Sequence, residues 1–333
     1  MNWTELSDGD RLSVLEEIRK RTGFPLFIIE KDWWVVQTLR LISRMNIAEH
    51  TVFKGGTSLS KAWRLIDRFS EDVDLAFNRE FFGFSGEISR TQIGKLKNAS
   101  NKYISNDFIF SLRKSFDNEG IKDVQLSVAD VKAADDDPVK IEIAYPTVAK
   151  YSAYVQPHVL LEIGSRSLIE PATLCSFRSM IGQTFSNLPF ADEDVTIRCV
   201  NPERTFLEKI FLLHEEHQRP KEKMQIKGKS RHFYDIYQIA KTPYADKALA
   251  DKELYNAIVT HREWFNKLKG VDYTSHFPPN LNPIPPAELM PEWEWDYAEL
   301  QEQMIAGKSL SFDRIIQELR RIVEVINGKR DFT

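Results

Sequence analysis

Two aspartates separated by one residue, Asp72 and Asp74, have the clearest capacity for chemistry in this sequence. The apolar run from Val73 to Phe77 predicts a strand, so both carboxylates leave it on the same face, about 7 Å apart at Cα. Carboxylates this close repel each other unless a cation lies between them. A hard divalent cation, Mg²⁺ or Mn²⁺, would bind both and keep positions open for phosphate oxygens. The alternative, one aspartate at the strand end and one facing solvent, fits the spacing equally well.

A glycine turn, Gly55-Gly56-Thr57-Ser58, stands between an apolar strand and a helical pattern upstream of these acids. Paired glycines allow a ligand to approach the backbone, and hydroxyls with free N–H groups at a helix start can bind phosphate. The turn is not a Walker P-loop, because the Gly-x₄-Gly-Lys-[Ser/Thr] spacing is absent and Lys61 lies too far into the helix. Plain helix-start chemistry is the alternative. With an acidic strand so close, the turn predicts a polyphosphate site facing a metal site.

A third carboxylate on a neighbouring strand would bind the metal and accept a proton from an attacking hydroxyl. Glu162 is our candidate, because it is the single charge in the apolar strand from Val159 to Gly164. Glu142 has the same character, but its strand alternates more regularly and the side chain could face solvent.

Four short motifs resemble those of the AbiEii/AbiGii-type toxins, which are nucleotidyltransferase-like proteins of type IV toxin–antitoxin and phage-abortive-infection systems, related to the MenT tRNA-modifying toxins. One departure is His232, which stands where Lys or Arg commonly precedes the Tyr/Asp pair of the fourth motif. In chain order the motifs are Gly55 to Leu59 with Lys61, Arg68 to Leu75, Arg204 to Lys209, and Arg231 to Tyr237.

The resemblance implies transfer of a nucleoside monophosphate from an NTP to a hydroxyl, with release of pyrophosphate. It implies an RNA acceptor such as the 3′ end of tRNA, and a growth-arresting toxin neutralised by a cognate antitoxin. It also adds Lys61 and Arg231 to the nucleotide-binding residues Gly55, Gly56, Thr57 and Ser58, beside the metal ligands Asp72, Asp74 and Glu162.

Lys209 and Asp235 belong to the last two motifs. On its helix Lys209 can point away from the apolar face and reach the β and γ phosphates, although a solvated lysine is the ordinary alternative. The resemblance makes Asp235 an active-site residue, either positioning Lys209 or activating the acceptor. An intrahelical ion pair with Arg231 would also explain this aspartate.

The segment from Arg219 to Arg231 carries six basic residues and one acid. A solvated loop explains this composition. The segment also connects Lys209 to Asp235, so it could hold triphosphate or RNA phosphates.

Periodicity predicts an α+β fold: a helical lead-in over residues 1–49, a core with a mixed sheet over 50–200, and a helical C-terminal half over 201–333. The glycine turn and the acid pair resemble a DNA polymerase β-like active site, so we expect the core to be a nucleotidyltransferase core of that type. Pro25 should open the second helix of the lead-in, and Asn201 and Ser311 should cap helices. Six prolines at 278–291 predict an extended connection. The predicted strands are 51–53, 73–77, 124–128, 139–144, 158–163 and 195–200.

The bulk composition excludes some functions and partners. A formal charge of −4, from 45 basic and 49 acidic residues, provides no global attraction to nucleic acid or to membranes. The two cysteines, Cys175 and Cys199, lack the spacing of a zinc site and are expected to be buried, reduced thiols. The N-terminus lacks a secretory leader and no apolar run approaches ~18 residues, so we expect a cytoplasmic protein.

Two other functions fit parts of the sequence. A metal-dependent glycosyltransferase also uses Asp-x-Asp, but it would lack the glycine turn one helix earlier. A catalytically silent nucleotide-binding or partner-binding module would keep the fold and bind NTP without releasing pyrophosphate.

Overall fold

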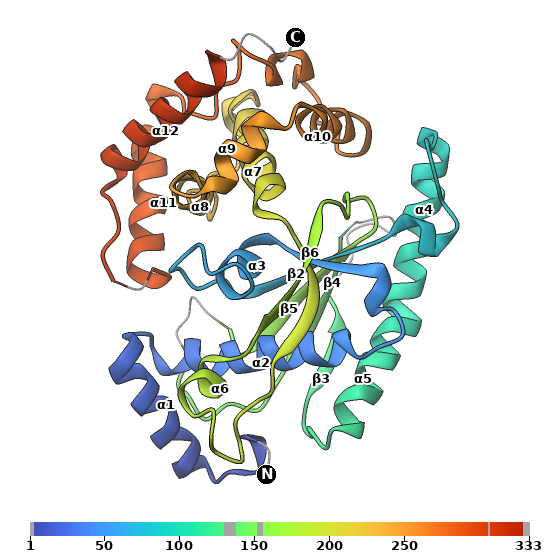
Figure 1. Cartoon of the computed structure of the whole chain (residues 1–333), viewed down its shortest axis with the longest axis vertical. Coiled ribbons are helices and arrows are strands. Elements are labelled where there is room, and N and C mark those ends of the chain that lie inside the picture. Colours follow the sequence, from blue (N-terminus) through green and yellow to red (C-terminus); the bar gives the residue numbers. More distant parts are fainter. Residues whose placement is uncertain (1–2, 130–137, 152–155, 306, 329–333) are drawn as a thin grey trace. The chain divides into compact units, whose positions relative to one another are not determined.

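The computed structural model describes residues 3–129, 138–151, 156–305 and 307–328 (Figure 1). The chain divides into two compact units. The first contains Met1–Trp63 and Phe69–Val200, and the second contains Arg64–Arg68 and Asn201–Thr333. The helical lead-in therefore folds with the sheet, whereas a short segment just before the acidic strand folds with the C-terminal half.

A mixed seven-stranded sheet forms the centre of the first unit, in the order β3-β4-β5-β2-β1-β7-β6. Strand β2 is antiparallel to β1 and parallel to β5, and β1 is parallel to β7. The predicted α+β class and all six predicted strands are confirmed, while edge strand β6 was not predicted. The strands are β1 (Thr51–Lys54), β2 (Asp72–Phe77), β3 (Gln125–Val128), β4 (Val139–Ala144), β5 (His158–Gly164), β6 (Ala172–Phe177) and β7 (Val195–Val200).

One face of this sheet is buried and the other carries the acids. Helix α2 runs across the buried face (Figure 1), where its tryptophans share a core with Val73, Leu75 and Leu161. Because side chains alternate along a strand, the neighbours of these residues must lie on the opposite face. The helices of the unit are α1 (Asp8–Thr22), α2 (Leu26–Ser43), α3 (Gly55–Lys61), α4 (Arg90–Tyr103), α5 (Ile109–Asn118) and α6 (Met180–Thr184).

Helix α2 begins after Pro25, as predicted, but its centre contains three consecutive buried charges at Glu30, Lys31 and Asp32. Lys31 donates to the carboxylate of Glu71 at 2.7 Å, directly before the acidic strand. Asp32 pairs with Lys61 at the end of α3. Buried charges are tolerated only when they are paired. These pairs therefore fix α2 to both segments that flank the predicted site.

The second unit is helical. Helices near the predicted positions of α7, α8 and α12 are confirmed, and Asn201 and Ser311 occupy the N-cap positions without making the side-chain cap hydrogen bond. Other helices were not predicted, and α11 begins inside the stretch expected to be extended, with Pro291 in its first turn. The helices are α7 (Pro202–His217), α8 (Arg231–Ala240), α9 (Pro243–Ala250), α10 (Lys252–Phe265), α11 (Met290–Gln303) and α12 (Phe312–Asn327).

Two other expectations concern the surface. Cys199 is buried, as expected, whereas Cys175 on β6 is only half-buried. Within the described residues, no helix combines the length and the apolar character that crossing a membrane requires.

Candidate active site

Asp72 and Asp74 lie at the start of β2 on the acidic face of the sheet. Both are half-buried, and Val73 between them is fully buried on the other face. The two carboxylates therefore share one side of the strand, the arrangement that a shared cation needs.

A row of four charged residues crosses this face over four adjacent strands. Asp74 is in register with Lys54 on β1 and with Glu162 on β5. Glu162 is in register with Lys140 on β4. Residues paired in this way project from the same face of a sheet. The order across the sheet is therefore Lys54, Asp74, Glu162, Lys140.

The register distinguishes the two candidates for a third carboxylate. Glu162 directly neighbours Asp74, whereas Glu142 is paired with Leu160, which separates it from Asp72. In this structure Glu162 is bound to Lys140, with Nζ and Oε1 2.5 Å apart. Among the described residues, no three His, Cys, Asp or Glu side chains converge as a metal site would require.

Lys140 was not singled out by the sequence. Burial lowers the pKa of Lys140, but the hydrogen bond to Glu162 and the charges of Glu162, Asp72 and Asp74 outweigh burial and hold the pKa above its ordinary value. The ammonium is therefore charged and within the field of all three acids. Only the strand register could reveal this, because nothing in the local sequence relates residue 140 to residue 162.

Gly55 is the point where the glycine turn meets the acids. Its φ of +78° lies in the left-handed region, and a Cβ at this position would overlap the Asp74 carboxylate. Only glycine satisfies both conditions without strain. The turn and the Asp-x-Asp motif therefore form one structure, in which the Asp74 carboxylate lies where a side chain of residue 55 would begin.

The other residues of the turn contact the backbone at the start of β2 and the side chain of Cys199 on β7. The Thr57 hydroxyl donates to the backbone carbonyl of Asp72 and, at 3.3 Å, to that of Ser70. Ser58 is buried against Cys199 of β7, and Gly56 is buried beside it in the first turn of α3. Thr57 and Ser58 thus have structural partners in addition to the predicted role toward phosphate.

Lys61 is not at the turn. It ends α3 and forms an ion pair with buried Asp32. The structure thus engages its ammonium in holding α3 to α2, and nucleotide binding by Lys61 stays a prediction.

A buried ionic cluster occupies the second unit. Asp235 of α8 receives two hydrogen bonds from the Arg68 guanidinium, at 2.7 and 2.8 Å, and pairs with the Lys209 ammonium of α7 at 2.9 Å. Arg68 belongs to the short segment that folds with this unit. The solvated-lysine alternative is wrong, because Lys209 is only 7% exposed.

The electrostatics of the cluster define the role of Asp235. Burial favours its neutral form, but Arg68 and Lys209 outweigh burial and hold the pKa of Asp235 below its ordinary value. Burial lowers the pKa of Lys209, and it lowers that of His232 well below the ordinary value. The ammonium can therefore donate to Nδ1 of a neutral His232 at 3.3 Å. Asp235 is a carboxylate saturated by cations, which suits positioning Lys209 rather than accepting a proton.

Arg231 is the first residue of α8 and is half-buried. Burial is the main cause of the lowered pKa of Lys209 and His232, and the charge of Arg231 lowers both further. Its guanidinium therefore lies near the cluster. Arg68 lies within the second motif, but the sequence indicates no role for it, because its partner, Asp235, is 167 residues away.

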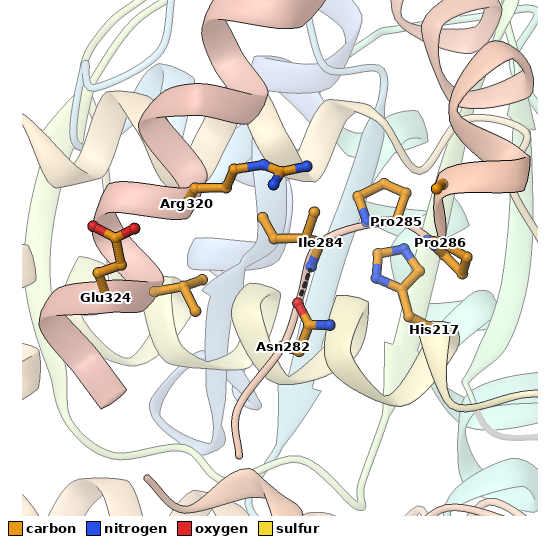
Figure 2. A pocket seen from close by; sticks show the side chains of 9 residues that line it. His217, Asn282, Ile284, Pro285, Pro286, Arg320 and Glu324 are labelled. Carbon is orange, nitrogen blue, oxygen red and sulfur yellow. Dashed lines mark hydrogen bonds between the residues drawn. The ribbon is translucent and has the colours of Figure 1, made fainter. Parts of the chain in front are cut away.

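A separate cleft of about 590 Å³ opens in the second unit and is lined by His217, Asn282, the 284–287 segment and Arg320 (Figure 2). Burial lowers the pKa of His217 to about 3, so its ring is neutral. The Arg320 side chain reaches from α12 toward the prolines (Figure 2). None of the predicted site residues lines this cleft.

The fold is similar to that of a solved nucleotidyltransferase. The structure of MenT4, the nucleotidyltransferase toxin Rv2826c from Mycobacterium tuberculosis H37Rv, is similar with a TM-score of 0.59 at 15% identity, covering 96% of this chain and 90% of that chain. At this identity the likeness shows the fold alone.

A family model described as "Nucleotidyl transferase AbiEii toxin, Type IV TA system" matches residues 38–318. The chain belongs to this family, so the predicted resemblance is confirmed and the glycosyltransferase alternative is wrong. No curated protein matches the chain in sequence.

Replacing Gly55 by Ala is expected to abolish nucleotidyl transfer, because the new Cβ must displace the Asp74 carboxylate. Gly83→Ala is the matched control, since Gly83 has a φ of +80° but nothing within 4 Å of its Cβ position. Transfer assays and thermal unfolding of both variants separate the steric effect from backbone strain. Equal losses of activity in the two variants would contradict this account.

Lys209→Met is expected to remove activity while retaining stability, because Arg68 still pairs with Asp235 and a buried charge is lost. Asp235→Asn removes the carboxylate that binds two buried cations, Arg68 and Lys209, and is expected to lower the free energy of unfolding by about 3–5 kcal/mol. Urea unfolding with a transfer assay checks both, and equal destabilisation would contradict the assignment.

The same cluster has a pH signature. The pKa of Asp235 is depressed in the folded state, so its stabilisation is present above the ordinary aspartate pKa of about 3.9 and is lost as pH falls through the lower folded value. Asp235→Asn should flatten this part of the acid unfolding profile.

Proposed function

We propose that this protein transfers a nucleoside monophosphate from an NTP to a hydroxyl of an RNA acceptor, in a reaction that depends on Mg²⁺ or Mn²⁺. The observation that carries the proposal is the meeting of Gly55 with Asp74. The Asp74 carboxylate lies against the Gly55 backbone, where a Cβ would overlap it, so the glycine turn is held directly beside the acids.

The donor set suits a hard divalent cation. Asp72 and Asp74 provide carboxylate oxygens from one face of β2, and the register brings Glu162 beside Asp74. We assign metal binding to these three residues. When bound, the cation would polarise the α-phosphate and offset the charge of the triphosphate.

In the proposed reaction the acceptor oxygen bonds to the α-phosphorus and the bond from that phosphorus to the β-phosphate oxygen breaks. We assign to Glu162 the acceptance of the proton from the attacking hydroxyl, and pyrophosphate leaves. We assign to the glycine turn, from Gly55 to Ser58, and to Arg231 the binding of the triphosphate. Lys209, held by Asp235, offsets the charge that develops on pyrophosphate.

The basic segment supports an RNA acceptor. Lys221, Lys223 and Lys227 are exposed, whereas Lys229 pairs with buried Glu216 of α7. Asp296 of α11 accepts from the backbone N–H groups of Gly228 and Ser230, at 2.6 and 3.0 Å. Three exposed lysines on an anchored segment suit binding to phosphates. The 3′ end of tRNA is the acceptor we propose.

Membership of a type IV toxin family implies a nucleotide substrate and a cognate antitoxin. We propose that modification of the acceptor by this chain arrests growth and that the antitoxin opposes this effect.

The test incubates the protein with total tRNA, Mg²⁺ and each α-³²P-labelled NTP in turn, beside Asp74→Asn. Label on RNA from at least one NTP is expected, and the variant should lose it together with toxicity, because one metal-binding carboxylate becomes an amide. Metal-dependent NTP binding without pyrophosphate release would instead support a catalytically silent module.

Replacing Lys221, Lys223 and Lys227 by Ser is expected to weaken RNA binding and to reduce the slope of log affinity against log salt by up to about 2, since single strands release ~0.7 counterion per contact. Lys229→Ser is the matched control, because Glu216 already engages its charge. An unchanged slope in the triple variant would remove the segment from the acceptor site.

A further inference from the structure

The charged row across the sheet places a lysine at each end of the acid pair. Lys54 is opposite Asp74 and Lys140 is opposite Glu162, each on the strand next to its acid. The proposed function requires a divalent cation at these same acids. A fixed ammonium near a cation site opposes binding of the cation, and two flanking lysines on such a face therefore call for an explanation.

Lys140 is the lysine that contacts an acid. Its ammonium is 2.5 Å from a Glu162 carboxylate oxygen, and its side chain is about half exposed, so it can leave without opening the core. Glu162 is 21% exposed at the side chain and so is partly shielded from water. The ion pair thus neutralises the charge of Glu162. The other two acids of the site, Asp72 and Asp74, lie on the neighbouring strand β2.

Resting on the proposed function, we propose that Lys140 is a resident counter-charge that competes with the divalent cation for Glu162 and turns to the triphosphate when the nucleotide binds. The metal alone then meets two carboxylates and an opposing ammonium. With the nucleotide present, phosphate oxygens accept the ammonium and Glu162 becomes available to the metal. Lys140 therefore makes metal binding depend on nucleotide binding.

A plain cross-strand ion pair is the competing explanation. Such a pair contributes little to stability at a half-exposed site, and its loss would leave metal affinity unchanged. The two explanations differ in a measurement that does not involve turnover, which is the affinity for Mn²⁺ with and without nucleotide.

The experiment measures Mn²⁺ binding by calorimetry to the full chain and to Lys140→Met, each alone and with α,β-methylene NTPs, which cannot transfer their nucleotide. Lys140→Met should bind Mn²⁺ alone roughly tenfold more tightly, because one positive charge leaves the vicinity of a dication. With the nucleotide bound, the affinities of the two proteins should agree within about threefold.

Two controls separate the possible failures. Arg178→Met removes one positive charge from another ion pair of the same unit, with Asp194, and should leave Mn²⁺ affinity unchanged. Asp74→Asn should lose Mn²⁺ binding. If the wild type binds Mn²⁺ and Lys140→Met matches it in both conditions, the Lys140 proposal is wrong; if none of the proteins binds Mn²⁺, the proposed function fails as well.

Discussion

The close contact of Gly55 with the Asp74 carboxylate is the constraint on which the first unit depends. It exists because β1 turns into α3 through a glycine with a left-handed backbone, and because β1 and β2 are antiparallel in a register that brings residues 54 and 74 together. A residue with a side chain at position 55 would separate the two strands or displace the acid. Thr57 then ties the new helix to the backbone of the acidic strand, so turn and strand hold each other in place.

Ion pairs of buried side chains also fix the segment before the acidic strand. In the first unit Lys31 binds Glu71, and in the second unit Arg68 binds Asp235. Lys31, Arg68 and Asp235 lost their hydration on burial, and a buried charge is costly unless its partner is present. Such pairs therefore specify an arrangement more than they add stability. One member of each pair lies just before the acidic strand in the sequence, because Glu71 directly precedes the strand and Arg68 lies three residues earlier. The chain leading to the acidic strand is thus held at two points by charge.

Local periodicity predicted much of this structure. The strands have β-branched or apolar runs, and the acid spacing, the glycine turn and Glu162 could be recognised within a few residues of sequence. Edge strand β6 was missed because its exposed face carries Leu174 and its polar neighbours give no clear alternation. The partners of Lys140 and Arg68 could not be predicted at all. Both depend on pairings between distant parts of the chain, which a hydrophobic pattern does not record.

The assignment of Arg64–Arg68 to the second unit affects how the protein can be divided. A fragment that begins at Asn201 would contain all six helices of that unit that the structure describes, but Asp235 would be buried beside Lys209 without the guanidinium that binds both of its oxygens. A ribosome likewise releases Arg68 long before its carboxylate partner is made. The Arg68 guanidinium can therefore meet its carboxylate only after about seven tenths of the chain has been synthesised, long after the acids beside Arg68 have emerged.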